Sequence, residues 1–270
     1  MPNLNALNII TAQARVPHFY EDFPLILFWS QKSGCTSLAL WFFYQINLLE
    51  TALEGCEDSE YIHNYEFSIY KSDVTYQDKL INNLQNKQTN AYKLVRDPYK
   101  RAVSAFLFFI PFFEIQHPHW NPIKRYLYNN ENSPKGFSFK QFLYYLQYSK
   151  EIDIAVDPHY AQQYVPGEEE FVTNYIYLEN FDTTIRALEM KYNLKQAPLH
   201  ILTNSKHHQS GKLLYEGNYA DVDITDPLFP LFPLFPTYQS FYDKETLELI
   251  HSIFYQDFKT YKYPKLLLNS

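Results

Sequence analysis

The chain has 270 residues, a formal net charge of −7 and an unusually aromatic composition, with 25 Tyr and 22 Phe. This length is enough for one large domain with a sizeable core, and we predict a single domain over residues 1–270. The negative charge argues against a nucleic-acid partner, because such proteins normally present a basic face. Two cysteines in a chain of this length indicate a reducing compartment rather than a disulfide framework.

The sequence also predicts a soluble, cytoplasmic protein. The first ten residues contain neither the basic segment nor the long apolar run of a secretory signal peptide. The longest apolar run, residues 105–113, is interrupted by Pro111 and is shorter than the roughly 18 residues that a membrane-spanning helix needs. We therefore expect no membrane span.

The first predicted element is a buried strand, residues 25–29, which leads through a polar loop, residues 30–35, into a helix over residues 37–50. A helix N-terminus offers unpaired backbone N–H groups and the positive end of the helix dipole, so it suits an anion. Lys32 adds a positive charge, and Gly34 allows a close backbone approach. We interpret this stretch as a phosphate- or sulfate-binding loop; an ordinary strand–helix turn with one lysine is the alternative.

Three further elements precede the second informative stretch. Residues 58–70 form an aromatic-rich connection that contains His63. Residues 74–84 have helical periodicity, and residues 91–95 read as a second buried strand.

A second candidate anion site follows this strand. Arg96 stands at its carboxyl end, and Asp97 and Pro98 are a favoured N-cap and first residue for the next helix. Ligands of open α/β sheets bind at the carboxyl ends of the strands. Arg101 and Ser104 share a helix face, so together with Arg96 they can bind a phosphate, which a guanidinium contacts with two parallel donors. The alternative is an arginine paired with surface carboxylates beside a solvated helix face.

The second half of the chain continues to alternate between strands and helices, which predicts one α/β fold with a parallel sheet. Residues 228–236 repeat Leu-Phe-Pro three times, and recurrent proline favours an extended, polyproline-like segment. We interpret it as a loop packed on the body of the protein, with a substrate lid or a docking strip as alternatives. The other expected elements are an irregular segment over residues 110–138, a helix over 139–148, a strand over 175–178, and helices over 184–192 and 243–255.

The two candidate anion sites together resemble the cofactor motifs of sulfotransferases, and most closely those of the carbohydrate sulfotransferases, the chondroitin 4-O type and its bacterial relatives. The matching segments are Ser30-Gln31-Lys32-Ser33-Gly34-Cys35-Thr36-Ser37 and Arg96-Asp97-Pro98-Tyr99-Lys100-Arg101-Ala102-Val103-Ser104. Weaker likenesses at Asp157–Gln163, Tyr175–Phe181 and Ile253–Tyr263 extend the family-like region over residues 24–263. Gln31 stands where the family has proline, and Tyr160 where it has tryptophan.

This resemblance implies a P-loop-like central parallel sheet flanked by helices, the fold that sulfotransferases share with nucleotide kinases. It implies transfer of a sulfuryl group from 3′-phosphoadenosine 5′-phosphosulfate (PAPS) to an acceptor hydroxyl, with a saccharide or glycoconjugate as the leading acceptor and PAP as the product. The residues implied for the 5′-phosphosulfate are Lys32, Ser33, Gly34, Cys35, Thr36 and Ser37. Arg96 and Ser104 are implied for the 3′-phosphate.

An acceptor hydroxyl must lose its proton, so a general base is expected. His63 lies between the two cofactor motifs, as the base does in several sulfotransferases that modify heparan sulfate, and we favour it. His159 is the second candidate and is expected to line the acceptor site; Glu66 is a third choice. A structural role is the alternative for both histidines. Lys32 would stabilise the leaving group.

We expect no bound metal, because the pairs His117/His119 and His207/His208 have no Cys or Glu at ligand spacing. Two other functions remain open. A small-molecule kinase on the same fold is disfavoured because the nucleotide loop Gly-x-x-x-x-Gly-Lys-Ser/Thr does not occur in the chain. A non-catalytic nucleotide-binding or interaction protein is disfavoured by the retention of Lys32, Arg96 and Ser104.

Overall fold

The computed structural model describes residues 7, 11, 16–54, 62–86, 90–108, 118–151, 155–203, 213–227, 229 and 234–266. The chain divides into two compact units, Met1–Arg96 with Gln163–His208 and Asp97–Gln162 with Gln209–Ser270. The single domain over residues 1–270 stays a prediction. Across the described ranges, no helix is long and apolar enough to cross a membrane.

The first unit contains a parallel sheet with the strand order β1 (Leu25–Phe28), β2 (Asn90–Val95) and β3 (Asn174–Tyr177). Side chains of β1 alternate between two cores: Leu25 and Leu27 enter one, and the intervening residues of the strand enter the other. A parallel strand covered on both faces needs apolar residues throughout, which is why Leu-Ile-Leu-Phe is buried along its whole length. The predicted α/β class with a parallel sheet is confirmed.

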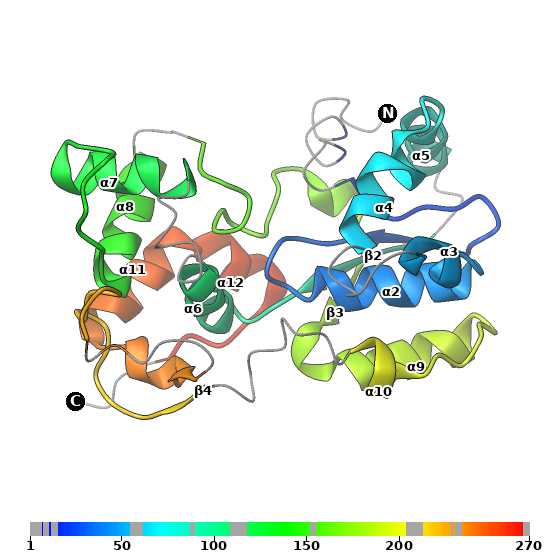
Figure 1. Cartoon of the computed structure of the whole chain (residues 1–270). Helices are drawn as coiled ribbons and strands as arrows, with labels where there is room; N and C mark the ends of the chain where they lie inside the picture. The colour runs from blue at the N-terminus through cyan, green and yellow to red at the C-terminus, as the bar shows by residue number, and fades with distance from the viewer. Residues whose placement is uncertain are drawn as a thin grey trace. The chain divides into compact units, whose positions relative to one another are not determined.

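Helices cover both faces of this sheet (Figure 1). On one face α2 (Cys35–Gln45) and α9 (Phe181–Lys191) share a core with the strands, and on the other α5 (Tyr76–Asn86) does. The smaller elements of the unit are α3 (Leu49–Leu53), α4 (Ile62–Ser68), η3 (Tyr70–Ser72), η6 (Glu168–Glu170), η7 (Leu178–Asn180) and α10 (Leu199–Leu202).

Two expectations for the first unit differ from the structure. The helix expected over residues 37–50 begins at Cys35 and ends at Gln45, because Asn47 adopts a left-handed backbone with φ 60°. The segment 58–70, expected as a connection, contains α4, which packs against α2. This second difference brings His63 onto a helix.

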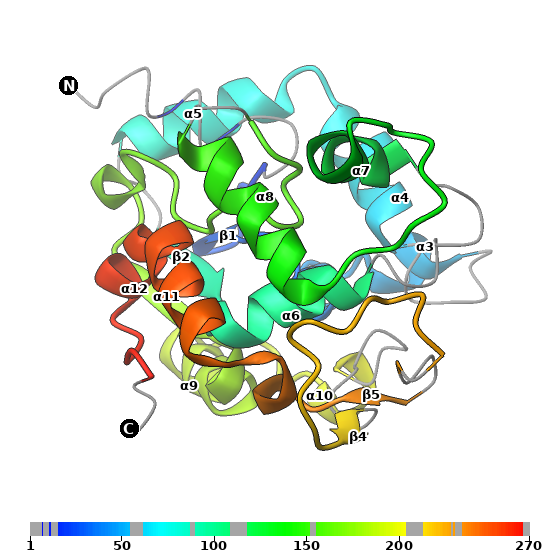
Figure 2. The ribbon, with the colours of Figure 1, turned by 90° about the vertical axis from the view of Figure 1, so that its left-hand side faces the viewer.

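The second unit is built around an aromatic core of α6 (Pro98–Phe108), α8 (Phe139–Glu151) and α11 (Lys244–Ile253). Figure 2 shows α8 and α11 side by side. The remaining elements are η5 (Pro118–Trp120), α7 (Asn121–Tyr128), β4 (Leu213–Tyr215), β5 (Phe235–Pro236), η9 (Tyr238–Phe241) and α12 (Tyr255–Tyr261).

Helix starts in the second unit follow the predicted capping chemistry. Helix α6 begins at Pro98, and Asp97 Oδ1 accepts a hydrogen bond from Tyr99 N at 2.8 Å. Asp243 caps α11 through a capping box with Thr246. The irregular segment expected over residues 110–138 contains α7, since a proline near the start of a helix is compatible with it.

The Leu-Phe-Pro segment lies partly outside the described residues. Of its aromatic side chains, Phe229 and Phe235 are buried in the core of the second unit. β5 pairs with β4 as a two-residue edge strand. These contacts favour a loop packed on the body of this unit, while the lid and docking alternatives stay open.

We predict that Asp243→Ala lowers the free energy of unfolding by about 1 kcal/mol, because it removes the cap of α11. Urea denaturation measures this change. Asp243→Asn is the matched control, because asparagine caps as well as aspartate but loses the ion pair of Asp243 with Lys140. An equal loss in both variants would show that the ion pair, and not the cap, stabilises the helix.

Candidate functional site

The loop between β1 and α2 is a tight turn held in a rare backbone conformation. Lys32 and Gly34 both have left-handed backbones, with φ 64° and 89°. Ser33 N donates to Ser30 O at 3.2 Å, and the hydroxyls of these two serines lie 2.9 Å apart. Left-handed non-glycine residues such as Lys32 are uncommon and cluster at functional sites.

Helix α2 begins in a way that suits an anion. Gly34 is its N-cap, and within the described residues no side chain caps this end. The first turn, Cys35-Thr36-Ser37, also contains no acidic residue. Among the described residues, neither a side-chain cap nor a first-turn carboxylate therefore occupies the backbone N–H groups and positive dipole end, unlike at α11. An anionic phosphosulfate fits this end of the helix.

Gly34 is fixed by its surroundings as well as by its backbone. A Cβ atom at this position would lie 2.5 Å from Leu178 Cδ1. Leu178 follows β3, so the turn is packed closely against the carboxyl edge of the sheet. Any side chain here would have to displace the loop or the leucine.

Gln163 connects the loop to the second predicted motif. Its side-chain Oε1 accepts hydrogen bonds from Ser33 Oγ at 2.7 Å and from Arg96 N at 2.9 Å. Its Nε2 donates to Arg96 O at 2.7 Å. The side chain is fully buried. Sequence reasoning placed Gln163 only at the end of a family-like segment and missed this bridging role.

Arg96 follows β2, at the strand end where the sequence placed it, and lies beside the loop. Its Nη1 donates to Lys32 O at 2.9 Å. The first unit thus brings together the loop lysine and the arginine at the end of β2. Their roles in binding the two ends of a nucleotide stay predictions.

The other two members of the second predicted anion site lie in the second unit, on α6. Ser104 is buried. Arg101 is also buried, and its guanidinium donates to Ala161 O at 2.6 Å and to the carbonyls of Pro158 and His159. These contacts favour a structural role for Arg101 in holding the turn 158–161. Because Arg96 and Ser104 belong to different units, their joint action on one phosphate stays a prediction.

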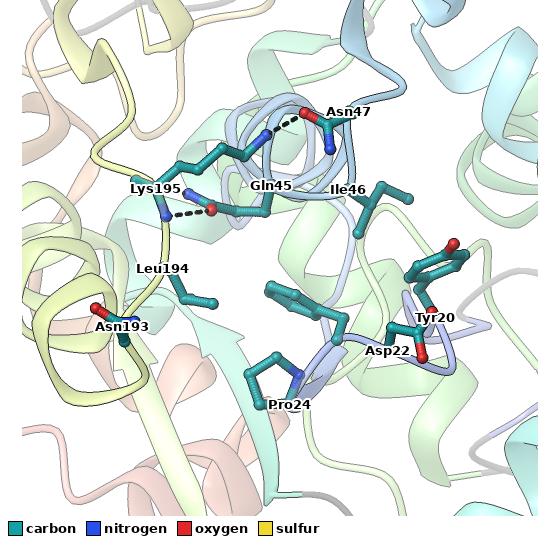
Figure 3. A pocket seen from close by; sticks show the side chains of 10 residues that line it. Tyr20, Asp22, Pro24, Gln45, Ile46, Asn47, Asn193, Leu194 and Lys195 are labelled. Atoms are coloured by element: carbon teal, nitrogen blue, oxygen red, sulfur yellow. Dashed lines mark hydrogen bonds between the residues drawn. The ribbon is translucent and has the colours of Figure 1, made fainter.

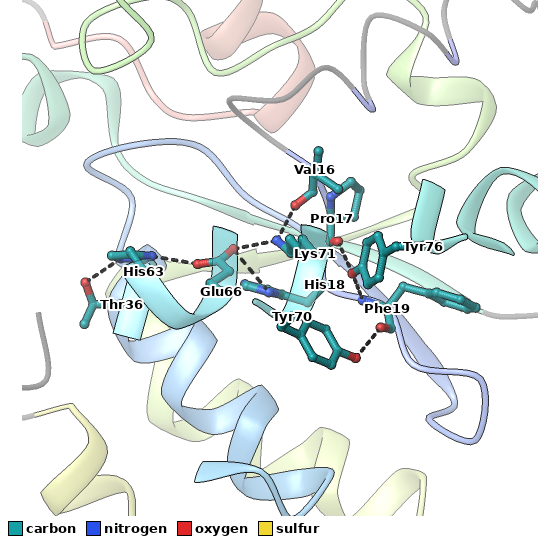
Figure 4. Close-up of polar contacts among 10 residues, drawn as sticks. All are labelled: Val16, Pro17, His18, Phe19, Thr36, His63, Glu66, Tyr70, Lys71 and Tyr76. Atoms are coloured by element: carbon teal, nitrogen blue, oxygen red, sulfur yellow. Dashed lines mark hydrogen bonds and ion pairs between the residues drawn. The ribbon is translucent and has the colours of Figure 1, made fainter. Parts of the chain in front are cut away.

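His63 lies against the first turn of α2 (Figure 4). Its Nδ1 is 2.7 Å from Glu66 Oε2, and its Nε2 is 3.1 Å from Thr36 Oγ1. Burial lowers the pKa of His63, but hydrogen bonds with Cys35 and Glu66 outweigh burial and raise the pKa to about 10. At neutral pH the ring is therefore an imidazolium that donates from both nitrogens.

Cys35 is the other titratable group at this helix end. Burial raises the pKa of its thiol, but the hydrogen bond from His63 and that ring's charge lower it below the ordinary value. The thiol and the ring therefore stabilise each other's charged forms. The raised pKa of His63 depends on both Cys35 and Glu66.

His159 belongs to the second unit. Its Nδ1 donates to Asp157 Oδ1 at 2.7 Å, and its ring stacks on Phe108 at 4.8 Å. The second oxygen of Asp157 lies 2.9 Å from His119 Nδ1. A place for His159 in the acceptor site stays a prediction.

Metal binding is not suggested by the part of the chain that the structure describes, which contains no group of three His, Cys, Asp or Glu residues arranged for it. His119 is paired with Asp157. His117, His207 and His208 lie outside the described residues.

A pocket of about 310 Å³ in the first unit lies at the other end of α2 (Figure 3). Polar residues that line the pocket form hydrogen bonds with one another: Lys195 Nζ donates to Asn47 Oδ1 at 2.7 Å, and Lys195 N donates to Gln45 Oε1 at 3.1 Å. The pocket adjoins the residues before β1, whereas the loop follows β1. We assign it no chemistry.

A family model described as the sulfotransferase family matches residues 21–264. The match spans most of both units. Comparisons with curated proteins and with solved structures find no match.

We predict that Gly34→Ala lowers the free energy of unfolding by about 1–2 kcal/mol from its left-handed backbone alone, with a further loss from the contact with Leu178. Urea denaturation of Gly34→Ala, Leu178→Ala and the double variant separates the two causes. The cost of Gly34→Ala should be smaller in the Leu178→Ala background. A wild-type stability for Gly34→Ala would contradict the structure of the loop.

Proposed function

Because this chain belongs to the sulfotransferase family, whose enzymes use PAPS, we propose that residues 32–37 hold the 5′-phosphosulfate and that His63 is the general base. One observation carries the proposal. The Nε2 atom of His63 lies 3.1 Å from Thr36 Oγ1, in the first turn of the helix whose N-terminus would hold the donor.

Several residues of the loop could hold the donor. Lys32 offers a positive charge, and the first-turn amides of α2 offer N–H donors. We propose that Arg96 binds the 3′-phosphate; a part for Ser104, which belongs to the second unit, stays a prediction. When bound, PAPS would supply the sulfuryl group: a bond would form from its sulfur to the acceptor oxygen as the bond to the 5′-phosphate oxygen breaks, with PAP as the leaving group. Lys32 and the amides would stabilise the negative charge that develops on this leaving group.

His63 would take the proton of the acceptor hydroxyl at Nε2. The proton on Nδ1 stays there, in a hydrogen bond to Glu66, because an ionised carboxylate accepts hydrogen bonds but does not donate them. In the donor-free protein the ring is protonated at neutral pH, so Nε2 must first lose a proton to serve as a base. The neutral fraction therefore limits the rate below about pH 10.

We propose a saccharide or glycoconjugate as the acceptor. Phe67 supports this class, because it is an exposed aromatic residue next to the candidate base. Its ring stacks on the His63 ring with a centroid distance of 6.2 Å. Exposed aromatic faces pack well against the C–H faces of sugars, which would bring a hydroxyl near Nε2.

Donor binding tests the proposed loop. PAP should raise the Tm of the protein, and ATP with magnesium should not. Lys32→Met should weaken PAP binding about tenfold or more, because a charge-assisted hydrogen bond contributes about 1.5–3 kcal/mol. Lys79→Met removes an exposed lysine elsewhere in the same unit and should leave the affinity unchanged. Stabilisation by ATP and not by PAP would overturn the proposal.

The pH dependence of sulfate transfer tests the base. With a pKa of about 10 for His63, the neutral fraction rises about tenfold per pH unit, so the rate from labelled PAPS should rise steeply between pH 6 and 9. His63→Asn should lose transfer while it still binds PAP. A flat profile, or full transfer by His63→Asn, would exclude His63 as the base.

A further inference from the structure

Glu66 is a buried carboxylate directly behind His63 (Figure 4). The two residues are three apart on α4 and therefore share a helix face. Glu66 is 0% exposed, and its Oε2 accepts from His63 Nδ1 at 2.7 Å. An ionised carboxylate only accepts hydrogen bonds, so this contact keeps a proton on Nδ1 and leaves Nε2 facing Thr36.

A second buried charge holds this carboxylate in place. Lys71 follows α4 on η3, and its Nζ donates to Glu66 Oε1 and to Val16 O. The ammonium also lies 5.7 Å from the ring centroid of Trp29 and 5.5 Å from that of Phe67. Although burial raises the pKa of Glu66, the charge of Lys71 and the hydrogen bond with His63 hold that pKa well below its usual range.

His18 completes the surroundings of Glu66. It is 0% exposed, its ring is 5.1 Å from that of Phe42, and its Nδ1 is 3.5 Å from Glu66 Oε1. Burial, reinforced by the charge of Lys71, lowers the pKa of His18 well below its ordinary value, so this ring is neutral. Burial also lowers the pKa of Lys71, while the charge of Glu66 opposes that shift. The carboxylate thus faces the ammonium of Lys71 on one side and the ring of His63 on the other.

Stability alone gives little reason for this arrangement. Burial of an ion pair is costly, and apolar side chains of similar volume usually stabilise a core as well or better. The pair is placed instead where it controls one ring. Its anion contacts the nitrogen of His63 that does not face the loop, and its cation contacts the other oxygen of that anion.

We propose that Glu66 and Lys71 are positioning residues for His63. Glu66 fixes the orientation and tautomer of the ring. Lys71 offsets part of the negative charge of Glu66, so that the ring loses its second proton more readily. The part of this inference that concerns catalysis rests on the proposed function of His63 as the base. The electrostatic coupling itself does not depend on that function.

The coupling predicts opposite effects for the two buried residues. Glu66→Gln removes the anion and should lower the midpoint of the His63 titration by about 1–3 pH units, because an opposite charge in contact stabilises the imidazolium. Lys71→Met leaves the carboxylate without its cation, so its attraction for the imidazolium grows and the midpoint should rise. Residues that only support the fold would give no such pair of opposite shifts.

The test is an NMR titration of the full chain labelled with ¹⁵N-histidine, in which the His63 signals are identified by their absence from His63→Asn. Other charged groups also face this ring: Cys35 on α2 contacts it, and Lys32 acts on Cys35. Cys35→Ser is therefore titrated in parallel. Glu189→Gln is the matched control, because Glu189 is a buried carboxylate of the same unit that accepts from Trp41 at 2.9 Å. It should leave the His63 midpoint unchanged.

Glu66→Asp keeps the charge but shortens the side chain, so its midpoint should lie between those of wild type and Glu66→Gln. Measuring this variant keeps the test decisive if either main variant does not fold. In transfer assays, the rate of Glu66→Gln should begin to rise at a lower pH than that of wild type, by the same amount as the midpoint of the His63 titration moves. Its limiting rate at alkaline pH should fall about tenfold, because a weaker base accepts the proton less readily, while KM for PAPS stays near wild type.

The outcomes separate the two proposals. Unchanged His63 midpoints in the folded Glu66 and Lys71 variants would overturn the positioning roles, whatever the enzyme transfers. Shifted midpoints in a protein that neither binds PAP nor transfers sulfate would overturn the proposed function but leave the coupling established. Shifted midpoints with a matching shift of the rate profile would support both.

Discussion

The buried amide of Gln163 is the contact on which the geometry of the first unit's site depends. It accepts from Ser33 in the loop and from the backbone of Arg96 at the end of β2, and it donates back to Arg96. The loop and the strand end are therefore fixed to each other before any ligand arrives. Because the loop and the strand end are already ordered, anion binding does not have to order them, and less of the binding energy is lost.

Charged pairs are buried beneath this site in the first unit. Lys93 on β2 contacts Glu168 and Gln163 O, and Lys71 contacts Glu66. In the first pair, Lys93 also donates to the carbonyl of Gln163, whose side chain bonds to the loop. The second pair lies behind His63. In a low-dielectric interior such pairs fix geometry strongly, because removal of one partner leaves an unpaired charge.

Local features were predicted well where short-range chemistry decides them. The cap at Asp243, the start of α6 at Pro98 and the apolar strand at residues 25–28 all depend on neighbours within a few residues. The break after Gln45 was missed because asparagine can adopt a left-handed backbone, as Asn47 does, but often does not, so its presence alone does not predict a helix end. Helix α4 was missed because it has only seven residues and its buried positions, Ile62 and Glu66, do not form an apolar stripe.

The sequence by itself determined the family, the parallel α/β class and the chemistry available at Lys32, His63 and Arg96. Only the tertiary structure decided that the ring of His63 meets Thr36 across 27 residues of chain, and that a lysine holds the carboxylate behind it. Motifs and caps depend on interactions between near neighbours, so short stretches of the sequence are enough to predict them. The state of a buried ring depends on which distant charges pack around it, and this is fixed only when the core forms.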